Sequence, residues 1–432
     1  MLRDKSLLTR ISLLGWLVAS LLSFIATQSV VANSPQDYET GQLVVKVMQP
    51  SEINIDVINQ IYGTSTLMSL YNHQNVFLLK APPGTNAEQL VEIMAQDPRL
   101  EYAELNYFNE NPESGSTDRI YGWGGYESTP YQGQEATNEM KLEEVHTYNR
   151  GADVVVAIID GGIQLDHPAL AKSLYGLGFD FVDNDPFPAD EANGLDDDGD
   201  GKLDEGYGHG THVAGIVHLV APEASLMSLR VLNSDGRGNI FKTANAILFA
   251  TYNGADVINL SLGTTYPSEL LSDVVREAAR MGVVVVAAAG NMNLDIKQYP
   301  AGEACALAVT SVDSRGKKSS FANYGSWIDL AAPGENIYST FPINGYAWWS
   351  GTSMATPFVS GQAALLRSYR PQLTLNEMGR FIGATAQPLD RINPAYRSML
   401  GMGKIDILAS LKELVAGTMP SPDENIFADC TP

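Results

Sequence analysis

The chain has 432 residues, of which 44% are hydrophobic, and this is enough for one large domain and one small one. Its formal net charge is -23, and no run of Lys or Arg offsets it, so binding to nucleic acid or to anionic lipid is not expected. The mixed composition, with 39 Gly and 18% charged residues, is typical of a compact globular protein rather than a disordered one.

Residues 1–32 have the pattern of a secretory signal peptide. Arg3, Lys5 and Arg10 make a basic start, and the uncharged apolar run 11–26 follows. That run is about 16 residues long, shorter than the ~20 of a membrane-spanning helix, so we expect a cleaved signal rather than an anchor. The protein is therefore predicted to be extracytoplasmic, either secreted or periplasmic, with no stable membrane association after signal removal.

Residues 33–110 are predicted to form a small α+β domain. Strands are expected at 42–47, 75–80 and 100–105, and a helix with apolar residues at Leu90, Val91 and Met94 is expected at 87–96. Residues 111–128 follow, within a stretch rich in Gly, Ser, Asn, Pro and Tyr that has no periodicity. They are predicted to be an exposed linker of the kind that proteases cut.

Residues 129–417 are predicted to form a large α/β domain. Continuous apolar runs, typical of strands buried on both faces, occur at 154–159, 225–231, 257–260, 283–289 and 306–312. Helical patterns lie between them at 243–253 and 270–281. This alternation predicts a parallel sheet with helices on both faces. The tail 418–432 is rich in Pro and acidic residues and is expected to be loose.

Polar residues that directly follow buried strands are candidates for a site, because ligands bind at the carboxyl ends of parallel strands. Asp160 follows the run 154–159, and Asn291 follows 283–289 after a Gly; a helix cap and a turn residue are the plain alternatives. Ser353 precedes a helical pattern, with Pro357 expected within about the first turn. His209 and His212 are three apart, which is not the spacing of a helical zinc motif, so a metal role for them is disfavoured.

Four segments together resemble the subtilisin (subtilase) family of serine proteases over about residues 141–414. They are IIDGG at 158–162, HGTHVAG at 209–215, AAGN at 288–291 and GTSMATP at 351–357. The order Asp, His, Ser along the chain is that of the subtilisin family. The resemblance implies a seven-stranded subtilisin-type parallel sheet and no organic cofactor. Gly161 departs from the family, because many relatives carry Thr or Ser there.

The resemblance implies a role for each matched residue. Ser353 is the expected nucleophile, His209 the general base and acid, Asp160 the group that orients His209, and Asn291 an oxyanion donor. An extended substrate is expected between residues 234–238 and 260–263, with a primary pocket lined by small or apolar residues that favours large apolar side chains unless Asp295 points into it. The expected substrate-binding residues are Gly236, Arg237, Gly238, Ser261, Leu262, Gly263, Ala289 and Gly290.

An acidic loop at 196–205 has carboxylates at alternate positions, as in the first half of a calcium loop. Tyr207 occupies the position of the bidentate Glu, so the loop is not a full EF-hand. We expect calcium rather than a merely solvated loop, because clustered carboxylates repel one another without a cation. The predicted ligands are Asp196, Asp198, Asp200 and Asp204.

The N-terminal domain resembles, more loosely, the inhibitory propeptide of the same family. This implies a zymogen whose propeptide blocks the cleft as an intramolecular inhibitor and is cut off by self-cleavage in the linker. The expected function is a secreted serine endopeptidase acting on proteins and peptides; a catalytically inactive relative that only binds, and a calcium-dependent structural module, are the alternatives. Cys305 and Cys430 either pair or remain as two thiols, and the sequence does not decide between these.

Overall fold

The computed structural model describes residues 37–48, 54–113 and 121–430. The predicted signal segment 1–32 lies outside the described residues. Among the described residues, no helix combines the length and apolar character needed to cross a membrane.

The N-terminal domain is an antiparallel sheet with two helices. Its strands run in the order β2 (Ser65–Ser69), β3 (Val76–Lys80), β1 (Tyr38–Val47) and β4 (Leu100–Glu110). Helices α2 (Ile55–Tyr62) and α3 (Ala87–Met94) contribute Ile58 and Met94 to its core. The predicted α+β character holds; α2 and β2 were not predicted, since β2 is exposed throughout and α2 has only one buried residue.

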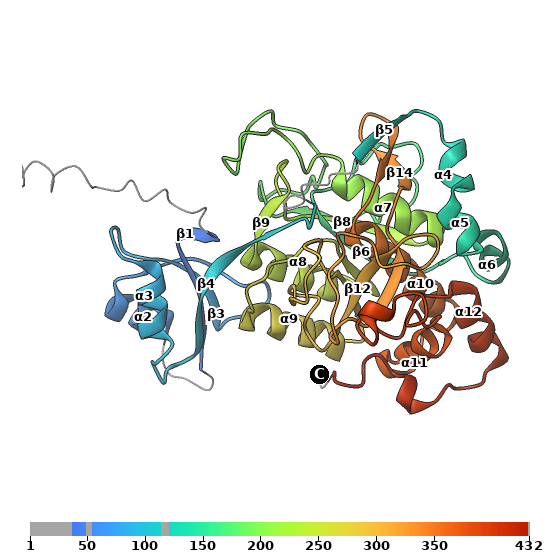
Figure 1. Cartoon of the computed structure of the whole chain (residues 1–432). Coiled ribbons are helices and arrows are strands. Elements are labelled where there is room, and N and C mark those ends of the chain that lie inside the picture. The colour runs from blue at the N-terminus through green and yellow to red at the C-terminus, as the bar shows by residue number, and fades with distance from the viewer. Residues whose placement is uncertain (1–36, 49–53, 114–120, 431–432) are drawn as a thin grey trace, which may run out of the picture. The chain divides into compact units, whose positions relative to one another are not determined.

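The large domain is built on a parallel sheet of seven strands, which confirms the predicted fold class (Figure 1). In spatial order the strands are β13 (Leu330–Pro333), β12 (Ala306–Val312), β11 (Val284–Ala288), β10 (Val257–Leu260), β6 (Val155–Asp160), β8 (Ser225–Arg230) and β7 (Phe179–Asp180). Strands β10, β11 and β12 are buried at every residue, which is why they are continuous apolar runs rather than alternating ones.

Two pairs of helices flank this sheet. Helix α7 (His209–Val220) packs on α10 (Thr352–Tyr369), and α8 (Ile240–Tyr252) packs on α9 (Glu269–Arg280). Helices α7 and α10 are buried over most of their length, so neither has a wide polar face. The two helices begin close to the carboxyl ends of the strands, where a site is expected.

A second, smaller sheet joins the segment after the linker to the large domain. Its order is β14 (Ile337–Phe341), β15 (Gly345–Trp349) and β5 (Tyr121–Gly125), and the short helices α4 (Thr129–Gly133), α5 (Glu135–Glu139) and α6 (Leu142–Tyr148) follow β5. Because β5 pairs with β15, ordered structure of the large domain begins before the predicted boundary at residue 129.

The prediction that 111–128 is an exposed linker is wrong where the structure describes it before β5. Asn111 and Glu113 are only 2% and 4% exposed. Their burial has no signature in local periodicity, because it depends on strand β4 entering a groove of the large domain, described below. Residues 114–120, in which cleavage was also predicted, lie outside the described residues.

The C-terminal region packs on the large domain. It contains α11 (Leu375–Thr385), η1 (Pro394–Tyr396), α12 (Ile407–Ala416) and η2 (Pro422–Glu424). The two cysteines are paired: a disulfide joins Cys305 to Cys430 across a sequence separation of 125 residues. Phe427 is 1% exposed, so the expectation of a loose tail is wrong up to residue 430, because the disulfide and this buried ring anchor it.

Candidate active site

The four residues singled out after the strands come together at one edge of the sheet. Asp160 is the last residue of β6, His209 the first of α7 and Ser353 the second of α10. Asn291 follows β11 after Gly290, which has a φ of 101° that Gly adopts without strain. All four are buried, with Asn291 the most exposed at 9%.

Asp160 and His209 form a short, fully buried pair. Nδ1 of His209 lies 2.7 Å from Oδ1 of Asp160, and the Gly161 N–H donates to the same oxygen at 2.7 Å. Oδ2 of Asp160 is buried and has no hydrogen-bond partner among the described residues. A hydroxyl on residue 161, which many relatives have, could donate a hydrogen bond to the Asp160 carboxylate, and Gly161 has no such group.

The charge of His209 is set by its two carboxylate neighbours. Burial alone would lower the pKa of His209, but the charges and hydrogen bonds of Asp160 and Glu113 outweigh it and raise the pKa to about 10. His212, which faces the same region, donates from Nε2 to the carbonyls of Ile337 and Ala347, and burial lowers its pKa to about 3. His209 is therefore a cation and His212 is neutral near pH 7.

Ser353 and His209 are both hydrogen-bonded to Glu113 rather than to each other. The Ser353 hydroxyl lies 2.8 Å from Oε2 of Glu113, and Nε2 of His209 lies 3.2 Å from the same oxygen. Within the described part of the chain, no hydrogen bond joins Ser353 to His209 directly. Glu113 was not a candidate from the sequence, because a Glu in an aperiodic segment carries no distinguishing pattern.

Asn291 is held so that its amide N–H points at the same carboxylate. Its Oδ1 accepts from the N–H and the hydroxyl of Thr352, at 3.0 and 2.9 Å. This fixes the side-chain orientation, and Nδ2 then donates to Oε1 of Glu113 at 3.0 Å. The amide is thus aimed at the point where an oxygen next to Ser353 would sit.

Helix α10 carries Ser353 on a distinctive local structure. Pro357 lies inside the helix, in its second turn, not in the first as predicted. A proline there cannot donate to the carbonyl four residues earlier, which is that of Ser353. The Ser261 hydroxyl donates to this carbonyl instead, at 3.0 Å, so the proline is accommodated and Ser261 is tied to the nucleophile position.

Asp190 positions the start of α7 and was missed from the sequence. One oxygen accepts from the Gly208 N–H at 3.0 Å, and the other accepts from the N–H and hydroxyl of Thr211 at 3.1 and 2.6 Å. These bonds satisfy N–H groups at the helix N-terminus, where His209 stands. Nothing in the local pattern marks this Asp among its many acidic neighbours.

Strand β4 of the N-terminal domain lies between the two segments predicted to bind substrate. It pairs antiparallel with β9 (Arg237–Asn239), with Asn109 opposite Gly238. On its other side, Glu110 and Gly263 exchange both backbone hydrogen bonds, at 3.0 and 2.9 Å. The Asn111 N–H continues the pairing on the β9 side by donating to the Gly236 carbonyl at 3.0 Å. The chain's own N-terminal domain therefore occupies a groove between two strand-like edges.

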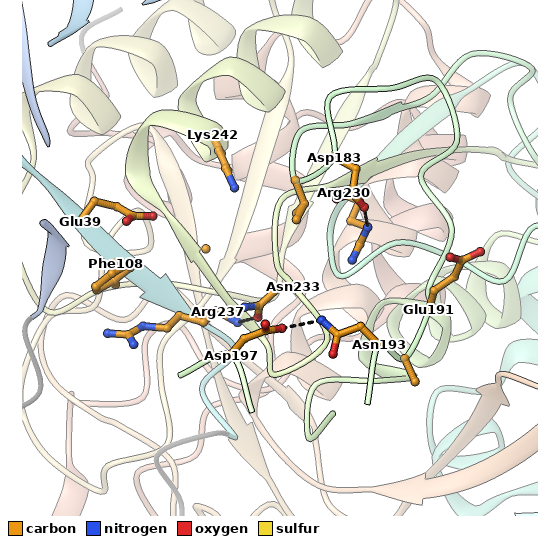
Figure 2. Close-up of a pocket in the computed structure, with 13 residues that line it drawn as sticks. Glu39, Phe108, Asp183, Glu191, Asn193, Asp197, Arg230, Asn233, Arg237 and Lys242 are labelled. Carbon is orange, nitrogen blue, oxygen red and sulfur yellow. Dashed lines mark hydrogen bonds and ion pairs between the residues drawn. The ribbon is translucent and has the colours of Figure 1, made fainter. Parts of the chain in front are cut away.

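A polar hollow of about 460 Å³ adjoins β9. Figure 2 shows Arg237 beside Phe108 at its edge, and the guanidinium lies 3.6 Å from the ring centre. Nε of Arg237 also pairs with Oε1 of Glu110 at 3.3 Å. The side chain of Arg237 is thus engaged by β4, and the hollow is distinct from the point where Ser353 lies.

The predicted primary pocket is not lined only by small or apolar groups. A Cβ at Gly263 or at Gly290 would overlap the side chain of Gln298, which is 6% exposed. The Asp295 carboxylate instead lies against Gly325, where a Cβ would overlap it. The preference for large apolar substrate side chains was predicted from a pocket lined by small or apolar residues. That premise is incomplete, because the side-chain amide of Gln298 lies between the two segments that line the pocket.

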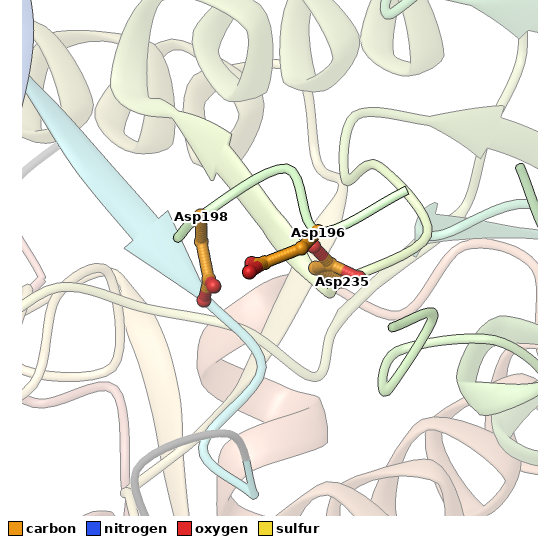
Figure 3. Close-up of side chains that lie close together, drawn as sticks. All are labelled: Asp196, Asp198 and Asp235. Atoms are coloured by element: carbon orange, nitrogen blue, oxygen red, sulfur yellow. The ribbon is translucent and has the colours of Figure 1, made fainter. Parts of the chain in front are cut away.

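The acidic loop brings together only part of the predicted calcium set. Figure 3 shows Asp196, Asp198 and Asp235 close together, and one oxygen of each lies within 4.8 Å of the others. Asp200 instead pairs with Lys202, and Asp204 accepts from the N–H groups of Asn193 and Gly194. Asp200 and Asp204 therefore lie outside this cluster, and Asp235, which comes from another loop, joins it; linear spacing cannot reveal such a contact.

A buried Asp and His pair, a Ser at a helix N-terminus and an Asn amide, carried by a seven-stranded parallel sheet, define a serine hydrolase of the subtilisin type. Residues 151–403 match the model of the subtilase family, and residues 25–106 match that of the fervidolysin N-terminal prodomain. The chain therefore belongs to the subtilase family and is a serine endopeptidase with an N-terminal prodomain.

The chain is similar to several curated proteases. It is 43% identical to thermitase of Thermoactinomyces vulgaris over 251 residues, covering 55% of this chain and 84% of thermitase. It is 31% identical to an alkaline protease of Alkalihalobacillus alcalophilus over 402 residues, covering 88% of this chain and 95% of that protease. Among solved structures, fervidolysin of Fervidobacterium pennivorans has the same fold, with a TM-score of 0.72 and 22% identity over 90% of this chain and 62% of fervidolysin.

Proposed function

We propose that the protein hydrolyses peptide bonds through an acyl-enzyme on Ser353. The observation that supports this is that Ser353, His209 and Asn291 all contact one carboxylate, at 2.8 to 3.2 Å, while Asp160 holds the far side of His209 at 2.7 Å. A carbonyl carbon in place of that carboxylate carbon would be in reach of the Ser353 hydroxyl. Its oxygen would meet the Asn291 amide.

The reaction follows from this placement. Ser353 Oγ bonds to the carbonyl carbon as its proton passes to Nε2 of a neutral His209, and the carbonyl oxygen becomes an oxyanion held by Asn291. His209 then returns the proton to the leaving amine as the C–N bond breaks. Water repeats the sequence on the ester. Asp160 keeps Nδ1 protonated and stabilises the imidazolium throughout.

Substrate is proposed to bind as a strand in the groove that β4 occupies. Its backbone would pair with Gly236, Arg237 and Gly238 on one side and with Ser261, Leu262 and Gly263 on the other, and Ala289 and Gly290 would line the primary pocket. Labelling by a fluorophosphonate tests the proposal, because an activated Ser353 attacks the phosphorus, displaces fluoride and becomes covalently labelled. A purified, processed chain that takes up no label would favour the inactive relative that only binds.

We also propose an extracytoplasmic location. The basic start of residues 1–32, followed by an uncharged apolar run, supports it. The Cys305–Cys430 disulfide supports it as well, since such bonds persist in oxidising compartments.

A calcium ion is proposed at Asp196, Asp198 and Asp235. The three carboxylates suit it, because calcium takes oxygen ligands, and Asp235 is only 1% exposed. Burial raises the pKa of the Asp235 carboxyl, even though it accepts from the backbone of Asp197 and Asp204. A bound cation would offset the repulsion among these groups and stabilise the folded chain by mass action.

The calcium proposal predicts a melting temperature that depends on calcium. At a hundredfold excess over Kd, binding adds about 2.7 kcal/mol, roughly a 5 °C rise over a chelator-treated sample. Asp198→Asn should remove most of this rise, whereas the matched control Asp200→Asn, outside the cluster, should keep it. Calorimetry with and without chelator measures it. An equal rise in wild type and Asp198→Asn would place calcium elsewhere, and no rise in wild type would mean a solvated loop.

The prodomain is proposed to act as an intramolecular inhibitor, released after self-cleavage in the linker. Two of its side chains cap helices of the catalytic domain. Glu104 accepts from the Ser268 hydroxyl and from the N–H groups of Glu269 and Leu270, at 2.9 to 3.1 Å, at the start of α9. Asn106 accepts from the Phe241 N–H at 3.2 Å, at the start of α8. A carboxylate at a helix N-terminus is favoured by its free N–H groups and dipole.

Glu104→Ala is expected to weaken docking of the cleaved prodomain by about 10- to 100-fold, because three hydrogen bonds to a buried carboxyl group are lost inside the interface. Glu92→Ala is the control, since Glu92 is an exposed residue of prodomain helix α3. The fraction of prodomain that co-elutes with the mature enzyme in size-exclusion chromatography reports the difference. Equal retention in the two variants would show that the cap does not hold the prodomain.

A further inference from the structure

Strand β4 and the following Asn111 pair with the edges of the groove in the way proposed for a substrate strand, and this backbone pairing ends at residue 111. In an antiparallel pair, the residues that exchange hydrogen bonds recur every second position, so after Glu110 and Gly263 the next such pair is Pro112 and Ser261. Proline has no N–H and cannot make that bond. The Ser261 carbonyl instead lies 3.3 Å from the Ser353 hydroxyl, so the position of Pro112 is the one that adjoins the nucleophile.

Glu113 then turns its carboxylate into the catalytic centre. The side chain is 4% exposed, and its two oxygens are hydrogen-bonded to Asn291, Ser353 and His209. Gly351 leaves room for it, since a Cβ at Gly351 would overlap Oε1 of Glu113. One oxygen thus meets the amide proposed to stabilise the oxyanion, and the other lies between the nucleophile and its base.

This arrangement disables each catalytic group separately. The Ser353 hydroxyl has one proton, and its shorter contact, 2.8 Å to Glu113 against 3.3 Å to the Ser261 carbonyl, directs that proton to Glu113, so it is not given to His209. His209 lies between two carboxylates as an imidazolium and therefore has no lone pair with which to accept a proton. The Asn291 amide is already occupied. No substrate carbonyl can enter while the carboxylate is present.

We propose that the catalytic centre is a binding site for a side-chain carboxylate, and that Glu113 fills it as a latch that keeps the chain inactive while the prodomain is docked. The ligand that this site would take is the side-chain carboxylate of a residue that directly follows a proline in an extended segment, as Glu113 follows Pro112. The Glu113 latch rests on the proposed function of Ser353, His209 and Asn291. It goes beyond a prodomain that covers the groove through its backbone, because it assigns the inhibition to one charged side chain.

The latch should weaken as the pH rises. Two carboxylates contact His209, Asp160 on β6 and Glu113 after β4. Neutral His212 on α7 and the ring of Trp349 lie beside it, and Asp190 caps the start of the same helix at Gly208 and Thr211. With Glu113 in place the pKa of His209 is about 10, and removing one of its two carboxylate partners lowers it. His209 therefore binds its proton more tightly in the latched state than in the unlatched state. The resulting stabilisation of the latched state is complete below the pKa that His209 has without Glu113, and it is lost as pH rises through about 10.

The test uses the complete chain made by cell-free translation, in which every molecule starts at full length. A short pulse of fluorophosphonate is applied at several pH values, and the labelled fraction is measured separately for the full-length and processed bands. In Glu113→Gln, which keeps the shape but not the charge, full-length chain should label at least about tenfold faster than wild type at pH 7. Glu92→Gln, which removes the same charge from an exposed residue of prodomain helix α3, should match wild type.

The outcomes separate the latch from the proposed function. Equal labelling of full-length wild type and Glu113→Gln, with a processed band that labels normally, overturns the latch alone. A processed band that takes no label overturns the proposed function of Ser353. Glu113→Ala guards against a folding defect, since a folded variant still yields a processed band that labels at the wild-type rate. Labelling of full-length wild type should rise toward pH 10 more steeply than that of Glu113→Gln, and parallel profiles would contradict the latch.

Discussion

Ser353→Ala is expected to abolish hydrolysis of casein and to leave the chain at full length after signal removal. The loss should be about a million-fold in kcat, the scale known for removing the nucleophile of subtilisin itself. The physical reason is that Ser353 supplies the hydroxyl that attacks the carbonyl carbon, and alanine has no group that could form the acyl-enzyme. Because the first cut in the linker is proposed to be made by the chain on itself, the same change should stop maturation.

The measurement is casein hydrolysis together with the mass of the purified chain. Ser368→Ala is a suitable control, because Ser368 lies at the far end of the same helix, α10, where its hydroxyl is exposed and donates to the Ala152 carbonyl. It should be processed and active. Casein hydrolysis by Ser353→Ala equal to that of the wild type would refute the proposed mechanism, and processing of that variant in a protease-free preparation would refute self-cleavage.

Asn291→Ala is expected to lower kcat by about two to three orders of magnitude, the scale that this change has in subtilisin. The amide is fixed in advance by the two bonds that Thr352 makes to its oxygen, so it needs no reorganisation to meet a developing oxyanion. Its hydrogen bond strengthens as the carbonyl oxygen becomes charged, so KM should change little.

Steady-state kinetics on a chromogenic peptide measure this split between kcat and KM. Asn291→Leu keeps the volume without the donor and should show the same loss, which separates the lost hydrogen bond from a cavity. Asn293→Ala, two residues further on at an exposed position where the side chain accepts from Lys318, should behave like wild type. A large rise in KM with unchanged kcat would show that Asn291 binds the substrate and not the transition state.

The sheet and the four residues at its edge were accessible from the sequence because both depend on short segments. Strands buried on both faces are continuous apolar runs, so five of the seven were visible before the fold was known. Strand β7 has only two residues, and β13 has no β-branched residue and ends in a proline, so neither shows a strand pattern. Asp160, His209, Asn291 and Ser353 each stand in a distinctive run of small residues. Those runs are needed locally, because backbone must approach closely where side chains converge.

The prodomain boundary, the calcium set and the pocket were less accessible because they depend on long-range contacts. Nothing near residue 113 in the sequence reveals that β4 continues into the groove, since the partner edges are more than a hundred residues away at Gly236 and Gly263. Asp235 lies on a different loop from Asp196, and Gln298 reaches two glycines from separate segments. The cysteine pairing likewise required two distant positions to meet.

The sequence by itself determined the class of sheet, the domain order and the residue types available for chemistry, because apolar periodicity and short motifs are local properties. Only the tertiary structure decided which polar groups share a space: that Glu113 lies between Ser353 and His209, and that Asp190 holds the start of α7. A carboxylate has the same appearance in the sequence whether it is solvated or buried against a base. Its role is set by the three-dimensional neighbours that remove water and supply partners.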